Sequence, residues 1–159
     1  MDVNGFKGPN SEARNGKQYD IRSFKVAKFS KGCAGNEIKW LGCVSQLPSY
    51  SPIKAGSDEM KKWDPKWAEN SRYSQYDNYW AGAKKACDDI GMSLPDKSKL
   101  QSIYEAGKKD SSLGLPTSGF FWSSSEYTAY GAYGVSFGFG TTYDSDKDVS
   151  DRKVLCVGD

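Results

Sequence analysis

The sequence predicts an α+β domain, and three features along the chain indicate this class. Apolar residues fall at near-alternating positions in the segments 18–30 and 37–45, as they do in strands. They then recur at helical spacing in the segment 77–91. Short apolar runs return toward the C-terminus, and a strand pair followed by helices and then by strands is the order of an α+β domain.

Composition limits the partners that this domain is expected to have. The chain of 159 residues is the size of one domain and is long enough to bury its own core. Its 22 basic and 20 acidic residues give a net charge of +2, and no Lys/Arg cluster is longer than two. Nucleic acid is therefore not an expected partner. No apolar run approaches the roughly 18 residues of a membrane-spanning helix, so we expect no direct membrane span.

The first half of the chain is expected to contain an antiparallel strand pair. Its strands are the segments 18–30 and 37–45, and the link KGCAGN between them contains glycine. Cys33 in this link and Cys43 in the second strand are placed to form a disulfide that holds the strand pair together. Residues 46–78 contain several prolines and aromatic residues. We expect a long ordered loop there, because disordered linkers are poor in aromatic residues.

Two helices are expected next. The first covers DNYWAGAKKACDDIG, residues 77–91, with Asp77 as its N-cap and Gly91 as its stop. The second is a short helix that follows the N-cap Asp96 and precedes a loop at residues 108–119. The apolar spacing gives the first helix an inward face of Trp80, Ala83, Cys87 and Ile90, and the second an inward face of Leu100, Ile103 and Tyr104.

Short strands are expected to close the chain. The three segments are FFWS at residues 120–123, GVSF at residues 134–137 and KVLCV at residues 153–157. Val135 and Phe137 alternate with small residues, so they share one face of their strand. We expect that face, together with Val154 and Cys156 of the last strand, to point into the core.

The cysteines indicate the compartment. The chain has four cysteines and no histidine, and an even number of cysteines suits two disulfides. The cysteines lie too far apart in the sequence for the short paired spacing of a zinc site. Disulfides favour an extracellular or cell-surface protein whose export segment has been removed, and free thiols are the alternative.

Three motifs in the second half carry a family resemblance. They are GMSLPDKSKLQSIY at residues 91–104, FFWSSSEY at residues 120–127 and KVLCV at residues 153–157. In this order they resemble the C-terminal domain family of the Legionella collagen-like adhesin, which has the C-type lectin fold. The chain departs from the family at Met92-Ser93, where Trp-Arg is more usual. It departs again at residues 96–99, where Thr-x-x-Glu is more usual. The carboxylate that this Glu would supply at the start of the helix is therefore missing.

The resemblance implies a C-type lectin-like fold with two helices, a small mixed or antiparallel sheet and long ordered loops. Residues 76–159 would form the lectin-like core, and residues 1–75 would add strands and an irregular, aromatic-rich extension packed on the same domain. In this fold a cysteine of the first helix commonly pairs with one of the last strand. The resemblance therefore implies a Cys87–Cys156 disulfide, beside the Cys33–Cys43 staple.

The sequence lacks the residues of several kinds of active or metal site. The calcium-binding lectin motifs Glu-Pro-Asn or Gln-Pro-Asp and Trp-Asn-Asp are absent. Asp144, Asp146 and Asp148 have the spacing of an EF-hand loop, but Val149 and Leu155 stand where that loop needs Gly and Glu, so a solvated turn is favoured. The absence of histidine excludes histidine-based triads. We expect no enzyme activity, no cofactor and no metal.

Three further residues have expected structural roles. Glu126 is interpreted as a buried hydrogen-bonding residue that ties the WSSSEY turn to the core. Trp80 and Trp122 are interpreted as core residues in preference to a ligand platform.

Residues 128–152 have the composition of a contact surface, because they are rich in Tyr, Ser and Gly, which are enriched in the binding loops of antibodies. A branch of the C-type lectin fold serves as the variable protein of diversity-generating retroelements, in which Asn codons of a C-terminal repeat are randomised. Every residue of this segment except Lys147 can be encoded by an Asn codon randomised at its first two bases. The lack of Asn after Asn78 favours the alternatives, an undiversified adhesin domain or a plain Gly-rich β meander.

The sequence thus predicts a non-catalytic adhesin or receptor-binding domain whose ligand is a protein or glycan on another cell or surface. The alternative is a pilin-like or other surface-fibre subunit whose N-terminal hydrophobic helix was removed. The expected ligand-binding residues are Tyr130, Tyr133, Ser136, Phe139, Thr141, Tyr143, Asp144, Asp146, Asp148, Asp151 and Arg152.

Overall fold

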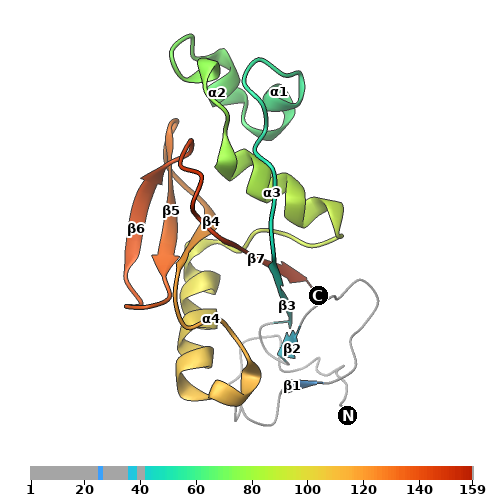
Figure 1. Cartoon of the computed structure of the whole chain (residues 1–159), viewed down its shortest axis with the longest axis vertical. Helices are drawn as coiled ribbons and strands as arrows, with labels where there is room; N and C mark the ends of the chain where they lie inside the picture. Colours follow the sequence, from blue (N-terminus) through green and yellow to red (C-terminus); the bar gives the residue numbers. More distant parts are fainter. Residues whose placement is uncertain (1–24, 27–35, 39–41, 159) are drawn as a thin grey trace.

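The structure is a computed structural model that describes residues 25–26, 36–38 and 42–158 (Figure 1). The first strands are β1 (Lys25–Val26), β2 (Asn36–Ile38) and β3 (Gly42–Leu47). The helices are α1 (Glu59–Trp63), α2 (Pro65–Glu69), α3 (Tyr79–Asp89) and α4 (Lys97–Lys109), with 3-10 turns η3 (Tyr73–Gln75) and η4 (Ser111–Leu113). The last strands are β4 (Phe120–Thr128), β5 (Gly131–Ser136), β6 (Thr142–Asp146) and β7 (Val154–Gly158). The chain therefore has the predicted mixed α+β class.

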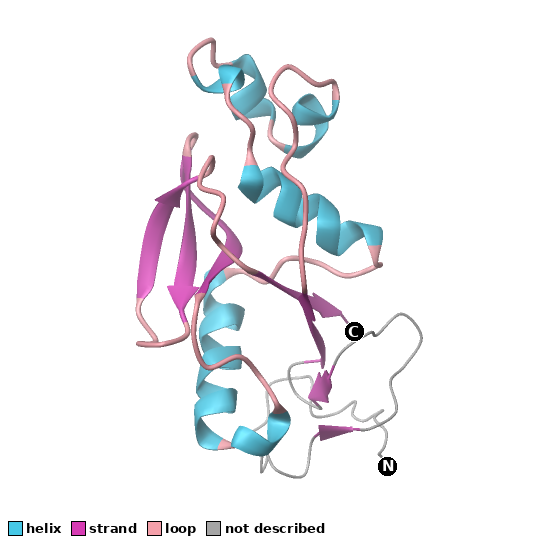
Figure 2. Cartoon of the chain, viewed as in Figure 1, coloured by secondary structure: helices cyan, strands magenta, loops and turns pink. Residues whose placement is uncertain are grey.

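The strands form two antiparallel sheets. One has the order β1-β2-β3-β7, so the last strand of the chain joins the N-terminal strands, with Cys43 opposite Gly158 and Leu47 opposite Val154. The other has the order β4-β5-β6 and is a meander of consecutive strands. Figure 2 shows this meander as a separate magenta sheet at one side of the molecule. The prediction of one small sheet is wrong, because β7 pairs with β3 and so belongs to a different sheet from β4, β5 and β6.

Local sequence accounts for both long helices. Asp96 caps α4, since its Oδ1 accepts a hydrogen bond of 2.8 Å from the Lys99 amide, as predicted. At α3 the predicted cap is wrong: Asn78 Oδ1 accepts from the Ala81 amide at 2.8 Å. Asp77 instead accepts from the Ala55 amide at 2.9 Å, which holds the preceding loop. Gly91 has the left-handed φ of 75° that ends α3 as predicted.

Three clusters of buried side chains make up the described core. The first lies around α4 and includes Leu100, Ile103, Phe121, Val135 and Phe137. The second joins α3 to the C-terminal strand and includes Trp80, Cys87, Trp122, Ala132 and Cys156. The third packs the 53–67 segment against α3 through Ile53, Met60, Trp67 and Ala81. The predicted core positions of Trp80, Trp122, Val135, Phe137 and Val154 are confirmed.

The disulfide between α3 and β7 is present. Cys87 and Cys156 are bonded across 69 residues of sequence, with their Cα atoms 5.4 Å apart. The second predicted pair involves Cys33, which lies outside the described residues, and its other member Cys43 is buried on β3. Most of the predicted strand 18–30 also lies outside them, although its residues 25–26 pair antiparallel with β2 as expected.

The predicted element boundaries need three corrections. The segment 46–78 is ordered but is not all loop, because it contains α1, α2 and η3; the described residues thus hold four α-helices where two were predicted. These helices are too short for an apolar period to be recognised. The segment 37–45 divides into β2 and β3. The second predicted helix is not short, since α4 continues to Lys109.

No helix of the described residues combines the length and apolar character needed to cross a lipid bilayer.

Candidate binding surface

The candidate binding surface is the β4–β6 meander, which contains most of the predicted ligand-binding residues. Strand β6 is its outer edge, at the side of the molecule in Figure 1. Thr142, Tyr143, Asp144 and Asp146 are exposed, and only Ser145 of this strand is buried. A strand whose side chains are exposed on both faces offers more contact area than one packed on a core.

The register divides the predicted residues between two faces of the meander. Tyr133 lies opposite Asp144, and Gly134 lies opposite Tyr143. Because side chains alternate along a strand, Tyr133 and Asp144 share one face, whereas Tyr143 lies on the other. We call these the Tyr133 face and the Tyr143 face.

Each face contains a small aromatic cluster with a basic side chain. On the Tyr143 face, the ring of Phe120 lies 6.1 Å from that of Tyr143, and the Arg152 guanidinium lies 4.2 Å from the Phe120 ring centre. On the Tyr133 face, the ring of Tyr127 lies 5.3 Å from that of Tyr133, and Lys97 Nζ lies 3.9 Å from the Tyr133 ring centre. The sequence did not single out Lys97, Phe120 or Tyr127 as part of a surface.

Other predicted residues lie at the two ends of the meander. Tyr130 is in the β4–β5 turn, where its ring lies 4.9 Å from that of Tyr73. Phe139, 81% exposed, and Thr141 are in the β5–β6 turn at the opposite end. The structure therefore does not gather all eleven predicted residues into one patch. Each of them is nevertheless exposed or half-buried, including Ser136 on β5 and Asp148, Asp151 and Arg152 after β6.

The remaining part of the 128–152 segment forms the support for these residues. Its buried members are Gly131, Ala132, Gly134, Val135, Phe137, Ser145 and Lys147. Gly134 lies on the opposite face from Val135, as the alternation along β5 predicts. It is nevertheless covered, because a Cβ there would overlap the Phe120 ring and the Phe121 carbonyl oxygen. Buried supporting positions are thus interspersed with exposed and half-buried ones along the segment.

Lys147 is fully buried and connects the meander to the rest of the fold. Its Nζ donates to Asp64 Oδ2 at 2.9 Å, Glu126 Oε2 at 2.8 Å and the Ala129 carbonyl at 2.9 Å. The same nitrogen lies 4.2 Å from the Trp80 ring centre. Sequence reasoning missed this contact, because Asp64 is 83 residues away. One feature of the sequence did set Lys147 apart. In residues 128–152 it is the residue that a randomised Asn codon cannot encode.

Hydrogen bonds hold the two carboxylates beside Lys147. Asp64 Oδ2 also accepts from Asn78 Nδ2 at 2.9 Å, and its Oδ1 accepts from the Trp67 amide at 3.3 Å. The predicted hydrogen-bonding role of Glu126 at the WSSSEY turn is confirmed, but its predicted burial is wrong, since the side chain is 32% exposed. Burial raises the pKa of the Glu126 carboxyl, and Lys147 and Lys66 outweigh this effect, so the pKa lies below its usual value.

A second lysine lies close to this cluster. Lys84 Nζ is 3.9 Å from the Trp80 ring centre. Burial lowers the pKa of Lys84, although the nearby carboxylates Asp64 and Glu126 act in the opposite direction. The Trp80 indole therefore contacts two cations, and its Nε1 donates to the Ser123 carbonyl at 2.7 Å.

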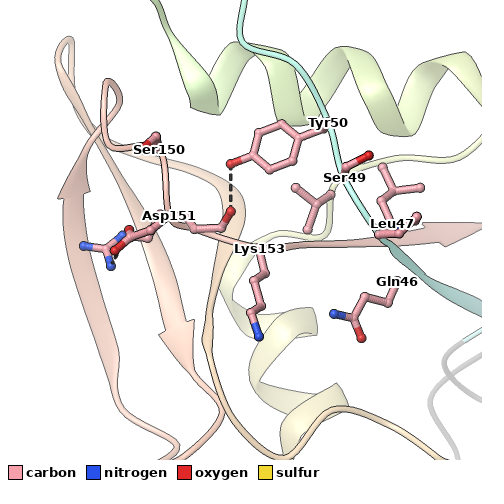
Figure 3. Close-up of a pocket in the computed structure, with 10 residues that line it drawn as sticks. Gln46, Leu47, Ser49, Tyr50, Ser150, Asp151 and Lys153 are labelled. Atoms are coloured by element: carbon pink, nitrogen blue, oxygen red, sulfur yellow. Dashed lines mark hydrogen bonds and ion pairs between the residues drawn. The ribbon is translucent and has the colours of Figure 1, made fainter.

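A pocket of about 400 Å³ adjoins the meander (Figure 3). Its lining includes Gln46 and Tyr50 from the N-terminal side and the predicted residues Asp151 and Arg152. Tyr50 is fixed at its wall, because its hydroxyl donates to the Arg152 carbonyl at 2.8 Å and accepts from Trp122 Nε1 at 3.0 Å. Figure 3 shows Gln46 and Lys153 among the side chains that line this pocket.

The acidic residues of the surface do not gather around a common centre. In the part of the chain that the structure describes, no group of three or more His, Cys, Asp or Glu side chains is arranged to hold a metal ion. Asp144 and Asp146 lie on β6, and Asp148 follows it. The surface consists of aromatic, hydroxyl and charged side chains suited to non-covalent contact.

Comparison with known proteins gives one family. No curated protein matches the chain. The model of a family described as a domain of unknown function, DUF8780, matches residues 67–158, from helix α2 through strand β7. This match covers more than half of the sequence, and the chain therefore belongs to the DUF8780 family.

Proposed function

We propose that this protein is a non-catalytic adhesin or receptor-binding domain that uses the β4–β6 meander to contact a protein or glycan on another cell or surface. One observation carries the proposal. Among the described residues, the exposed large apolar side chains are Tyr76, Tyr127, Tyr130, Phe139 and Tyr143, and all but Tyr76 belong to the meander. Exposed aromatic side chains are typical of interaction surfaces, and here they are concentrated on one sheet.

The support beneath these residues is rigid, which a binding surface needs. Val135 and Phe137 are buried against α4, and Trp122 and Ala132 are buried toward α3. The aromatic rings are therefore displayed at fixed positions, and less conformational entropy is lost on binding. The absence of histidine and the mainly aromatic and hydroxyl character of the surface fit binding without catalysis.

The proposal includes a C-type lectin-like fold and, within it, a retroelement-diversified surface. It is supported by the division of the 128–152 segment into buried positions and positions that are exposed or half-buried. Variation at the exposed sites would change the contacts and leave the core intact. Lys147, the residue that this route cannot encode, is fully buried and bonded. Location at the cell surface is supported by the Cys87–Cys156 disulfide.

The gene tests the diversification. Codons for the exposed residues should share the third base of an AAC or AAT template. A near-copy of the segment, with Asn codons at those sites, should lie beside a reverse transcriptase gene. Codons with different third bases, together with the lack of such a copy, would contradict diversification. The domain would then bind one fixed ligand and would not be selected from a set of variants with different ligands.

Binding is tested with the labelled domain on a glycan array and on a panel of intact cells. We expect binding by the unchanged protein and its loss in a variant that combines Tyr130→Ala, Phe139→Ala and Tyr143→Ala. Glu105→Ala is the matched control, because this exposed residue lies on α4. Equal binding by the triple variant and the control would contradict the proposed surface.

A further inference from the structure

We propose that the side chains of Lys147 and Asp64 become joined by an intramolecular isopeptide bond, with Glu126 as the acid–base group of the reaction. The geometry brings the three groups together. Lys147 Nζ lies 2.9 Å from Asp64 Oδ2 and 2.8 Å from Glu126 Oε2. The lysine side chain is 0% exposed and that of Asp64 is 2% exposed. This inference does not rest on the proposed function.

Burial provides the driving force for the bond. When an ion pair is buried, both ions lose their favourable hydration energy. The attraction between the two charges compensates this loss only in part. Condensation converts the buried ammonium and carboxylate into one neutral amide and releases a water molecule. The fold has already brought together two residues that are 83 positions apart, so the reaction does not bear the entropy cost of a bimolecular encounter.

The surroundings of Asp64 fit an acceptor of nucleophilic attack. Each carboxyl oxygen receives a hydrogen bond, from the Trp67 amide to Oδ1 and from Asn78 Nδ2 to Oδ2. Such donors stabilise negative charge on oxygen when a tetrahedral intermediate forms. Trp80 lies against Lys147 Nζ at 4.2 Å, and its apolar ring covers the amine.

Glu126 is placed to move protons between the reacting groups. Its Oε2 accepts a hydrogen bond from Lys147 Nζ. Its partial exposure, 32%, gives the departing water a route to solvent along the same side chain. A carboxylate within hydrogen-bond reach of the attacking amine satisfies the geometric condition for a general base.

The reaction balances without any further reactant. A proton passes from the Lys147 ammonium to the Asp64 carboxylate, which gives a neutral amine and a carboxylic acid. The Nζ lone pair forms a bond to Asp64 Cγ, and Nζ passes one proton to Glu126. Glu126 returns this proton to the hydroxyl that leaves Cγ as water. One N–H remains on the amide, and Glu126 Oε2 or the Ala129 carbonyl is in place to accept it.

Mass spectrometry of the whole chain tests the proposal. The protein is unfolded, reduced and alkylated, so that disulfides do not affect the mass. We expect a mass lower than that of the sequence by one water molecule. A tryptic digest should contain a branched peptide that joins Lys147 to Asp64, with no cleavage after Lys147. The full sequence mass in the purified, folded protein overturns the proposal.

Variants identify the atoms involved. Lys147→Met and Asp64→Ala should restore the mass of the uncondensed chain. Glu126→Gln keeps both reacting groups and should slow or prevent the mass loss, with circular dichroism to show that the variant is folded. Lys84→Met is the matched control, because Lys84 contacts the same Trp80 ring, and it should keep the lower mass. A mass loss that persists in Lys147→Met overturns the assignment.

Discussion

The ring of Phe120 on β4 packs over Gly134 of β5, which lies two residues from Ser136, the residue opposite Phe120 in the register. A Cβ at Gly134 would overlap this ring and the Phe121 carbonyl oxygen. Phe120 in turn contacts Tyr143 and Arg152 on the outer side of the meander. Gly134 therefore supports the Tyr143 face from within the sheet.

Gly134→Ala should destabilise the fold by about 1–3 kcal/mol, because a buried overlap forces the ring or the strand to move. Gly138→Ala is the matched control, since a Cβ there would have only Ser136 Oγ near it, at 4.0 Å. The control should change the free energy of unfolding by no more than about 0.5 kcal/mol. Urea unfolding of both variants measures this, and equal stability would contradict the packing of Phe120 on Gly134.

Phe137 and Phe139 should respond oppositely to truncation. Phe137 is 2% exposed in the cluster around α4, whereas Phe139 is 81% exposed. Phe137→Ala should cost about 3–5 kcal/mol, and Phe139→Ala no more than about 0.5 kcal/mol. Chemical denaturation gives both values. A large loss of stability in Phe139→Ala would show that this ring packs on the fold and is not displayed for a ligand.

Removal of the Cys87–Cys156 disulfide should lower the free energy of unfolding by roughly 4 kcal/mol, on the entropic model of chain cross-linking. The bond spans 69 residues, so it restricts a large part of the unfolded chain. The measurement compares thermal and urea unfolding of the unchanged protein with those of the double variant Cys87→Ala, Cys156→Ala. The same denaturation midpoint in both proteins would contradict the prediction.

Tyr50 should make the free energy of unfolding depend on pH in the alkaline range. Burial raises the pKa of its hydroxyl to about 12, although the hydrogen bond from Trp122 acts in the opposite direction. The folded state thus holds this proton more tightly than the unfolded state, in which tyrosine has a pKa of about 10. The contribution of Tyr50 is complete below pH of about 10 and is lost as the pH rises toward about 12.

Tyr50→Phe tests this dependence. The variant should be less stable at neutral pH, because the Trp122 indole N–H and the Arg152 carbonyl lose their partner. The difference in free energy of unfolding from the unchanged protein should shrink as the pH rises above about 10. Urea unfolding across this pH range measures the difference, and a constant difference would show that Tyr50 ionises equally in both states.

Features that depend on neighbours along the chain could be predicted from the sequence. Apolar spacing placed Cys87 on the inner face of α3, and alternation placed Val135 and Phe137 in the core. Asp96 could be identified as the N-cap of α4 because its side-chain oxygen accepts a hydrogen bond from a backbone amide only three residues later. Such interactions form within one helical turn or one strand, so their signals are local.

Features that join distant segments depend on the three-dimensional fold. Asn78, in place of Asp77, caps α3 because Asp77 is bonded to Ala55, which lies in another loop. The predicted surface residues divide between two faces and two ends of the meander because the strand register, and not their order in the sequence, sets their positions. Lys147 meets Asp64 only after the chain has folded, since a charge enters a core only where opposite charges and acceptors are already in place to compensate its lost hydration.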